Sequence, residues 1–369
     1  MTLTNKRPIL YFLLFICTFC FAQNKIIDSL TILKPTGSYS VGTMIYEWTD
    51  ESRILNLTNQ KNDKRTIIAQ IWYPAEIDKN SIKAKYSALS NDYKHVISNS
   101  YLRPSFNSSI TNSNVILISP GRGTERYLYT SLTEELASHG FIVVSVDMPE
   151  IGYTIYKDGF VVKPSKEYKT PQGMMGGPYE KVDAFFEKPT EIGYQDLLFT
   201  LAKLNELNQN DVNQRFKSKM NLQEIGIFGH SLGGRIAGKF AHQVNAVKAY
   251  ISMEGIPPRE VRYEGLLNIP VVMLCSSGTW PYAKENYFSL IDNRKNSVYM
   301  IELPEFGHNS VTDNPYIYPE SFNYSINASL GLEITRKIVL SYFNETLKKN
   351  TTFSNILIDI KQIKVSKYD

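Results

Sequence analysis

The sequence predicts an α/β protein in which a mostly parallel central sheet carries helices on both faces. Short apolar runs have the length and β-branched content of buried strands; they lie at 66–73, 115–119, 141–146, 224–228, 247–253, 269–275 and 298–303. Segments with helical periodicity follow several of them, at 127–138, 192–207, 235–241 and 334–347. Strands that alternate with helices in this way form parallel sheets that need cover on both sides.

Composition is that of an ordinary globular protein. The chain has 369 residues, 43% of them hydrophobic and 21% charged, and residues 23–369 fit one large domain. The formal net charge of +4 is small and there is no dense basic run, so no nucleic-acid partner is expected. No Cys/His cluster has the spacing of metal ligands, and neither a metal nor a cofactor is expected.

The first 22 residues have the pattern of a signal peptide. Lys6 and Arg7 precede an apolar run, and Cys20-Phe21-Ala22 offers a cleavage site before Gln23. We therefore expect a secreted or periplasmic protein, with a retained anchor as the alternative, although the run is short for a membrane span. Cleavage would leave Cys275 as the single cysteine, so no internal disulfide is expected and this thiol should pack as a small hydrophobe.

The most specific motif is Gly229-His230-Ser231-Leu232-Gly233. It lies between a predicted strand and a predicted helix and fits the nucleophile elbow G-x-S-x-G of α/β-hydrolases. In such a turn the serine has a strained backbone conformation and its hydroxyl stands clear of the sheet. We predict that Ser231 is a nucleophile; the alternative is a glycine-rich turn that only packs tightly.

A serine hydroxyl needs a histidine to take its proton, and five histidines are available. His308 lies in a loop after the last strand before the C-terminal helix. α/β-Hydrolases place their histidine there, last in the chain order serine, acid, histidine, so we predict His308 as general base. His95 and His242 are interpreted as structural or solvated, and His139 as a dipole partner at a helix C-terminus. The ring of His230 is expected to point away from the serine.

The acid should be a carboxylate at a strand end between the serine and the histidine. Glu254 directly follows the strand at 247–253. The next strand, where many α/β-hydrolases carry the acid, exits into Ser276-Ser277-Gly278-Thr279-Trp280 without a carboxylate. We predict Glu254, on a solvent-side loop. The nearest alternatives fall on or beyond a predicted helix; they are Glu285 and Asp292.

An oxyanion hole needs backbone N–H groups near the attacked carbonyl. One is expected from Leu232, the residue after the nucleophile. The other normally comes from the loop after an earlier strand, here Pro120-Gly121-Arg122-Gly123. The glycines on both sides of Arg122 let its backbone approach a substrate, so we predict the Arg122 N–H as second donor. A turn without a ligand is the alternative.

Two stretches depart from the strand–helix alternation. Residues 149–189 are long, aromatic and glycine-bearing, and leave the sheet at the edge where the site is expected. We interpret them as a lid-like insertion or pocket wall that controls substrate choice, against a plain surface excursion. After Asn350, the alternation of Ile356, Ile358 and Ile360 predicts an edge strand.

These residues together resemble the plasma-type platelet-activating factor acetylhydrolases, a branch of the α/β-hydrolases. The resemblance spans most of the chain after residue 22; it includes Val41-Gly42-Thr43-Met44, Ile71-Trp72-Tyr73-Pro74-Ala75, 136–143, the elbow and His308-Asn309. The resemblance implies an acid after the strand that follows the elbow helix, which favours Glu254. The family usually has aspartate at that position, and a His-Gly pair where this chain has Pro120-Gly121.

The sequence thus predicts a serine esterase that forms an acyl-enzyme. The substrate is a small-molecule or lipid ester: a phospholipid with a short or oxidised acyl chain, a soluble carboxylester, an acyl sugar or a polyester. A lipid substrate would bring transient contact with a membrane surface, and the oligomeric state is left open. The alternative from another class is a catalytically silent α/β-hydrolase fold that serves as a binding module.

Overall fold

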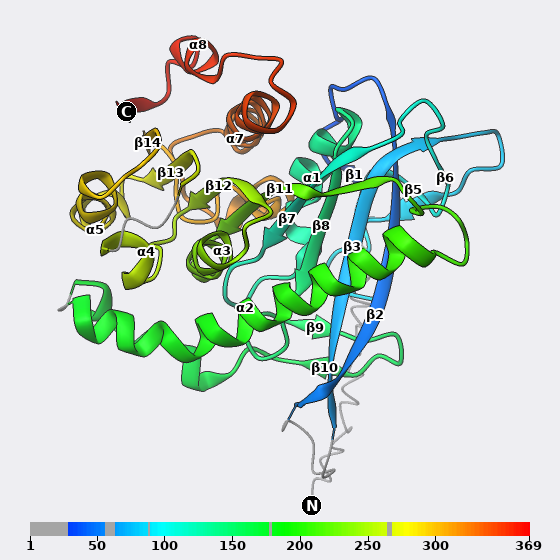
Figure 1. The fold of residues 1–369 in the computed structure, drawn as a ribbon, viewed down its shortest axis with the longest axis horizontal. Helices are drawn as coiled ribbons and strands as arrows, with labels where there is room; N and C mark the ends of the chain where they lie inside the picture. Colours follow the sequence, from blue (N-terminus) through cyan, green and yellow to red (C-terminus); the bar gives the residue numbers. More distant parts are fainter. Residues whose placement is uncertain (1–28, 56–62, 88, 177–178, 264–267) are drawn as a thin grey trace, which may run out of the picture.

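The computed structural model describes residues 29–55, 63–87, 89–176, 179–263 and 268–369. Within these ranges a sheet of 13 strands runs through the molecule in the order β1-β5-β2-β3-β8-β7-β11-β12-β13-β14-β15, with β4 beside β5 and β6 beside β3 (Figure 1). The predicted signal peptide, residues 1–22, lies outside the described part of the chain.

Six neighbouring strands of this sheet are parallel and form its centre. They are β8 (Ile142–Asp147), β7 (Ser113–Ser119), β11 (Met220–His230), β12 (Val247–Met253), β13 (Val271–Ser276) and β14 (Val298–Leu303). Their apolar runs are buried almost throughout, as expected for strands covered on both faces. Because they are parallel, their carboxyl ends meet at one edge of the sheet, where the loops that follow them converge.

The N-terminal part of the sheet contains antiparallel pairs. β3 (Lys64–Glu76) pairs antiparallel with both β8 and β2 (Ser40–Ile54), and so joins the parallel centre to an outer layer of shorter strands. Those strands are β1 (Leu30–Thr31), β4 (Lys83–Lys85), β5 (Val96–Leu102) and β6 (Ser105–Phe106). At the other edge β15 (Lys364–Tyr368) pairs antiparallel with β14.

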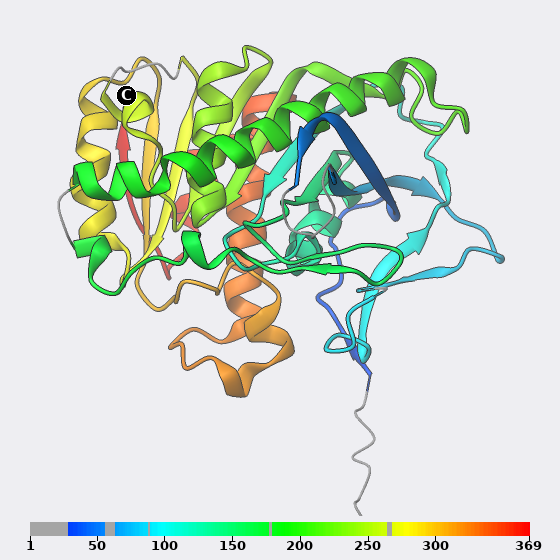
Figure 2. The same ribbon diagram turned by 90° about the horizontal axis from the view of Figure 1, so that it is seen from below.

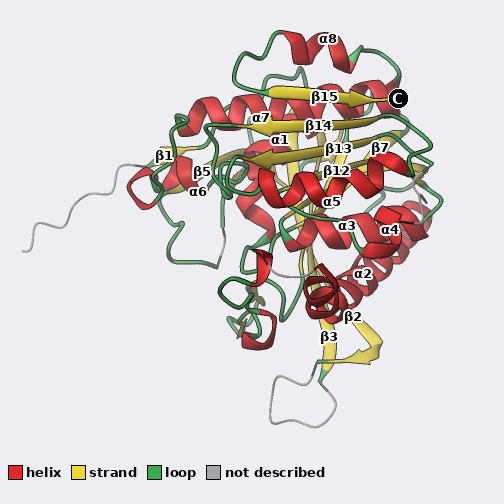
Figure 3. Ribbon diagram, turned by 90° about the vertical axis from the view of Figure 1, so that its left-hand side faces the viewer, coloured by secondary structure: helices red, strands yellow, loops and turns green. Residues whose placement is uncertain are grey.

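Helices cover both faces of the sheet, which confirms the predicted fold class (Figures 1 and 3). One face carries α2 (Tyr179–Asn210), α3 (Leu232–Gln243), α4 (Arg259–Tyr263) and α5 (Trp280–Asp292). The other carries α1 (Thr130–Ser138), α7 (Ala328–Phe343) and α8 (Phe353–Ile358). Each face buries its own apolar cluster against the sheet. Short elements complete the chain: η1 (Arg126–Tyr129), α6 (Asn314–Ile317), η4 (Pro319–Ser321) and the π-helical turn η5 (Asn344–Lys348).

The segment 149–189 contains several short regular elements and the first turns of a long helix. It begins with a small hairpin, β9 (Thr154–Ile155) and β10 (Val161–Val162), and continues through the 3-10 turns η2 (Lys166–Tyr168) and η3 (Met174–Gly176). The following helix was expected over residues 192–207, from its helical periodicity. Instead α2 begins at Tyr179 and contains Pro189, and this long helix crosses one whole face of the molecule (Figure 2).

The tail also differs from its predicted form. Ile356 and Ile358 belong to the helix α8, in which Ile358 is 80% exposed, and Ile360 follows that helix. The buried residues are Phe353 and Leu357, which are four apart and therefore share one helix face. An edge strand does form, but it is β15, which lies further along the chain.

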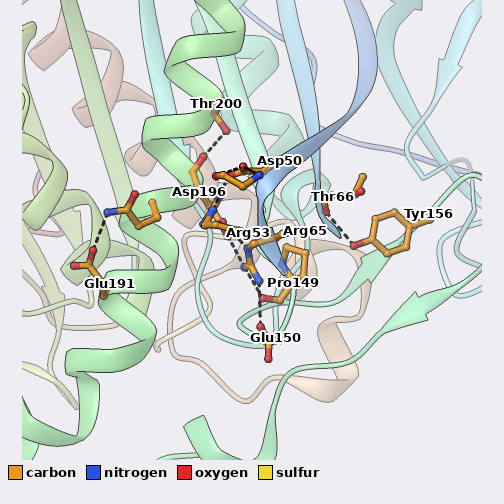
Figure 4. A network of polar contacts seen from close by, with 12 residues as sticks. Asp50, Arg53, Arg65, Thr66, Pro149, Glu150, Tyr156, Glu191, Asp196 and Thr200 are labelled. Atoms are coloured by element: carbon orange, nitrogen blue, oxygen red, sulfur yellow. Dashed lines mark hydrogen bonds and ion pairs between the residues drawn. The ribbon is translucent and has the colours of Figure 1, made fainter. Parts of the chain in front are cut away.

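A network of charged side chains fixes α2 to the antiparallel part of the sheet (Figure 4). The fully buried carboxylate of Asp196, on α2, accepts hydrogen bonds from Arg53 Nη1 at 2.7 Å and from Arg65 Nε and Nη2 at 2.7 and 2.6 Å. Arg65 also donates to the Pro149 carbonyl oxygen at 2.9 Å and to Glu150 at 3.1 Å. Charges are tolerated at such burial only when paired, so this network ties the start of the insertion to the hairpin β2–β3 and to α2.

Candidate active site

Ser231 lies in the sharp turn between β11 and α3. Its backbone has φ 56° and ψ −125°, a conformation that non-glycine residues rarely adopt and that tends to occur at functional sites. The chain can turn this tightly because a Cβ atom at Gly229 would collide with the carbonyl oxygen of Gly233. The Ser231 N–H donates to the Met253 carbonyl oxygen at 2.8 Å, which ties the turn to the end of the neighbouring strand.

A cavity of about 380 Å³ opens at this turn. It is lined by the three side chains predicted for catalysis, Ser231, Glu254 and His308, and by residues of the insertion and of the loops after β7, β12 and β13. A second hollow, of about 510 Å³, lies between α7 and the N-terminal segment and contains none of the predicted site residues. The chemistry expected from the sequence therefore belongs to the first cavity.

Glu254 and His308 are in direct contact in this cavity. Nδ1 of His308 lies 3.2 Å from Oε2 of Glu254, although the two residues come from the ends of β12 and β14. The structure corrects one expectation: Glu254 is not on a solvent-side loop but is only 6% exposed, because the exit of β13 covers it. Its backbone φ of 55° turns the chain directly after the strand, as at Ser231.

The loop after β13 has no carboxylate of its own, but its hydrogen-bond donors hold the Glu254 carboxylate. The Ser276 N–H donates to Oε1, the Ser276 hydroxyl to Oε2 at 3.0 Å, and the Thr279 hydroxyl also to Oε2. Burial by itself would raise the pKa of Glu254, but the hydrogen bond and charge of His308, together with these donors, lower the pKa below its ordinary value. The carboxylate thus stays ionised beside Nδ1 of His308.

The alternative carboxylates lie elsewhere. Glu285, on α5, accepts a hydrogen bond from the Tyr179 hydroxyl, and Asp292 is the last residue of α5. Within the described chain no hydrogen bond joins the Ser231 hydroxyl to His308, although both side chains line one cavity. Such serine–histidine bonds are often long in a free enzyme and shorten only when substrate is bound.

Both predicted oxyanion donors lie in the wall of the same cavity. Arg122 and Leu232 line it, and no atom of the described residues accepts a hydrogen bond from either backbone N–H. The loop around Arg122 is held by its neighbours: the Gly123 N–H donates to the Ile151 carbonyl oxygen at 2.9 Å. The Arg122 guanidinium donates to the Ser165 carbonyl oxygen at 2.8 Å, so its side chain reaches toward the insertion.

Comparisons with known proteins bear on the family and the fold. Residues 26–150 match the family model of platelet-activating factor acetylhydrolase, isoform II, and residues 114–273 match that of the alpha/beta hydrolase fold. The two matches together support a platelet-activating factor acetylhydrolase-like α/β hydrolase. The chain is thereby a carboxylic ester hydrolase.

A solved structure with the same fold is the ferulic acid esterase from Streptomyces cinnamoneus, with a TM-score of 0.73 and 20% sequence identity over 92% of this chain and 99% of the other. None of the curated proteins compared matches the sequence. The similarity to the solved esterase therefore concerns the fold, since so low an identity does not transfer a substrate.

The insertion of this hydrolase forms one wall of the cavity. Four of its side chains contribute, namely Thr170, Met175, Val182 and Phe186. Ion pairs dock the start of α2 beside the elbow helix: Asp183 accepts from Arg235 Nη1 at 2.7 Å and from Arg262 Nη2 at 2.8 Å. Arg235 belongs to α3, the helix that begins directly after Ser231, so the wall and the nucleophile share one support.

The hydrolase also uses residues that the sequence did not point out. The ring of His230, of which the sequence predicted only that it points away from the serine, contacts both Tyr129 and the backbone of His308. Ser276 and Thr279 hold the acid through their hydroxyls, and a run of hydroxyl residues at the exit of the next parallel strand is the signal that could have found them. Cys275 is buried in the core, as expected.

The described part of the hydrolase contains no group of three or more His, Cys, Asp or Glu side chains placed to hold a metal ion. It also has no helix both long and apolar enough to cross a membrane.

Proposed function

We propose that this hydrolase cleaves carboxylic esters with Ser231 as nucleophile, His308 as general base and Glu254 as the acid that orients the base. The observation that carries the proposal is the contact of the buried Glu254 with His308 in the cavity that contains the nucleophile elbow. In this arrangement Nδ1 of His308 donates to the carboxylate, so Nε2 is the nitrogen that is free to accept a proton.

The reaction then follows from the placement of these groups. Ser231 Oγ attacks the ester carbonyl carbon while Nε2 of His308 takes the hydroxyl proton. The backbone N–H groups of Leu232 and Arg122 stabilise the negative charge that develops on the carbonyl oxygen. His308 returns the proton to the leaving alcohol, and a water molecule releases the acyl group from the serine by the same steps.

The cavity supports two classes of acyl group. Its size and mostly apolar wall suit a short or truncated acyl chain, the type cleaved by the acetylhydrolases that the sequence resembles. The rings of Phe186 and Tyr282 in the lining favour an aromatic acyl group as second candidate. A polyester would use the same chemistry at a cavity open to a long chain.

The place of action is part of the proposal. The basic and apolar pattern of residues 1–22 supports export and removal of a signal peptide, so the mature chain would act outside the cytoplasm. Peptide sequencing of the N-terminus of the exported protein tests this: a first residue at or near Gln23 is expected, and a retained N-terminus contradicts it.

A fluorophosphonate probe tests the catalytic assignment without knowledge of the substrate. We expect labelling of Ser231 alone in the mature protein, and none in Ser231→Ala, which should lose at least about 10⁴-fold in ester hydrolysis. Esters that vary in acyl length and aromaticity, with phospholipids included, then separate the two acyl classes. A folded protein that neither reacts with the probe nor hydrolyses any ester would be a silent binding module instead.

A further inference from the structure

A continuous chain of buried hydrogen bonds joins the oxyanion loop, the nucleophile elbow and the loop of the general base. The Gly121 N–H lies 3.1 Å from the Tyr129 hydroxyl, which lies 2.8 Å from Nδ1 of His230. Nε2 of the same ring lies 2.8 Å from the backbone carbonyl oxygen of His308. Gly121 precedes the predicted oxyanion donor, and His230 precedes the nucleophile.

The direction of each bond follows from the chemistry of its ends. A carbonyl oxygen only accepts, so Nε2 of His230 must carry the proton. A neutral ring then has an unprotonated Nδ1, which accepts the hydroxyl proton of Tyr129. The hydroxyl oxygen of Tyr129 in turn accepts from the Gly121 N–H. With the proton on Nε2 of His230, all three hydrogen bonds of the series can therefore form at once.

Burial keeps this tautomer neutral. The side chains of Tyr129 and His230 are 0% and 1% exposed. Burial lowers the pKa of His230 to about 3, and the nearby His308 lowers it as well. The ring therefore does not take up a proton in the range in which a catalytic histidine works, and its two hydrogen bonds persist there.

The general base depends on support of this kind. The side chain of His308 is 47% exposed, so packing alone does not fix its position. Glu254 holds Nδ1 of its ring, but its backbone is held by His230, whose ring centroid lies 4.9 Å from that of His308. The oxyanion loop also packs closely against His230. A Cβ atom at Gly121 would lie 3.0 Å from Nδ1 of the His230 ring.

We propose that His230 and Tyr129 are positioning residues for catalysis. Through their hydrogen bonds they set the distance between the oxyanion donor loop and the general base, with the nucleophile between them. This role rests on the proposed function, and it explains why a fully buried, polar histidine stands directly before the serine. Misplacement of reacting groups by about 1 Å can lower turnover about 100-fold, so even a small shift of either loop should lower kcat.

The test removes individual hydrogen-bonding groups from this series of hydrogen bonds. Tyr129→Phe keeps the ring but leaves Gly121 and His230 without their partner; we expect kcat and the rate of phosphonylation of Ser231 to fall about 10- to 100-fold, with KM changed less than about threefold. His230→Leu should lose more than His230→Gln, because a glutamine amide can still donate to the His308 carbonyl. Rates are referred to active sites titrated with the probe.

Tyr342→Phe is the matched control. Tyr342 is also fully buried and its hydroxyl donates to the Pro270 carbonyl oxygen, but it lies away from the cavity, so it should lose stability and keep its turnover. The positioning role is wrong if Tyr129→Phe and Tyr342→Phe have the same turnover. It is also wrong if Tyr129→Phe changes KM and leaves kcat unchanged. If the wild type itself neither reacts with the probe nor hydrolyses an ester, the proposed function fails first.

Nuclear magnetic resonance of ¹⁵N-labelled histidine gives a readout that does not depend on turnover. We expect one ring, assigned by its loss in His230→Gln, to be protonated at Nε2 and to stay neutral below pH 5. In Tyr129→Phe the shift of its Nδ1 should move, and in Tyr342→Phe it should not. A His230 ring protonated at Nδ1 would reverse the chain of bonds and overturn the proposal.

Discussion

The two sides of the cavity are built by different means. On the sheet side, Ser231, Glu254 and His308 follow three parallel strands, and the acid is buried beneath four hydrogen-bond donors. On the other side, the insertion contributes long apolar side chains, among them Met175, which is 39% exposed. The comparison suggests that the sheet side determines the reaction, and the insertion determines which ester fits.

The two sides also differ in what holds them. The sheet side is fixed by backbone hydrogen bonds between strands, which any sequence that forms the sheet must make. The insertion and the part of α2 that continues it are held by side-chain ion pairs, above all those of Asp183 and Asp196. Changes on the sheet side should therefore alter turnover, whereas changes in the insertion should alter selectivity or stability.

The largest effect is expected from Glu254→Gln. The amide keeps the shape but loses the charge that stabilises the protonated imidazole, so turnover should fall about 10³- to 10⁴-fold, by analogy with serine-protease triads. Because Glu254 is buried among donors, the melting temperature should fall too. Steady-state kinetics on folded protein checks this, with Glu285→Gln and Asp292→Asn as controls that lose less than about tenfold.

The same position allows a finer test. Glu254→Asp introduces the residue usual in the resembled family but shortens the reach to His308, so a partial loss is expected. If Glu254→Gln stays near wild type while Glu285→Gln or Asp292→Asn is inactive, the acid comes from the region after β13, and the description of the sheet side is wrong.

The pH dependence should come from the base rather than from the acid. The lowered pKa of Glu254, below its ordinary 4.5, keeps the carboxylate ionised wherever histidines titrate, at about pH 6–7. Turnover should then fall about tenfold per pH unit below that range, as the imidazole takes up a proton. The stabilisation from Glu254 is present above about pH 4.5 and is lost only as pH falls through its lowered pKa. Flat turnover down to about pH 4 would exclude a histidine base.

A substitution in the wall should shift substrate preference. Phe186→Ala removes a ring from the cavity lining, so the ratio of kcat/KM between bulky and short acyl esters should change by about tenfold while the better substrate keeps its turnover. The matched control is Phe185→Ala, because Phe185 is the adjacent phenylalanine on α2 and does not line the cavity. Equal selectivity in both variants would mean that the insertion is a surface excursion that does not control substrate choice.

The smallest effect on catalysis is expected from the anchors of α2. Asp196→Asn removes the buried charge that Arg53 and Arg65 share and leaves them Asp50 and Glu150 as charged partners. Asp196 does not line the cavity, so the change should lower stability by up to about 3–5 kcal/mol and leave kcat and selectivity unchanged in folded protein. Asp183→Asn weakens the ion pairs that hold the start of α2 beside the elbow helix, so it should alter acyl selectivity as well. Chemical denaturation and the ester panel separate the two, and a selectivity change in Asp196→Asn would mean that α2 transmits strain along its length.

The sequence predicted the sheet and its main helices because each is encoded locally, by an apolar run or a helical period. It was less successful where tertiary contacts overrule a local signal. Pro189 was expected to lie before a helix, yet α2 runs through it, with Asp183 and Thr190 bound to Arg235 on α3. In the tail the alternation of isoleucines suggested a strand, but burial of Phe353 and Leu357 makes a helix.

By itself, the sequence determined the elbow. Glycine on both sides of Ser231, between a strand and a helix, permits the strained turn, and all of this information lies within about ten residues. Only the tertiary structure decided which carboxylate meets His308, that hydroxyls after β13 bury and hold it, and that His230 and Tyr129 bridge two loops. The reason is physical: these contacts join residues up to about a hundred positions apart, and they exist only once the parallel strands bring their ends to one edge of the sheet.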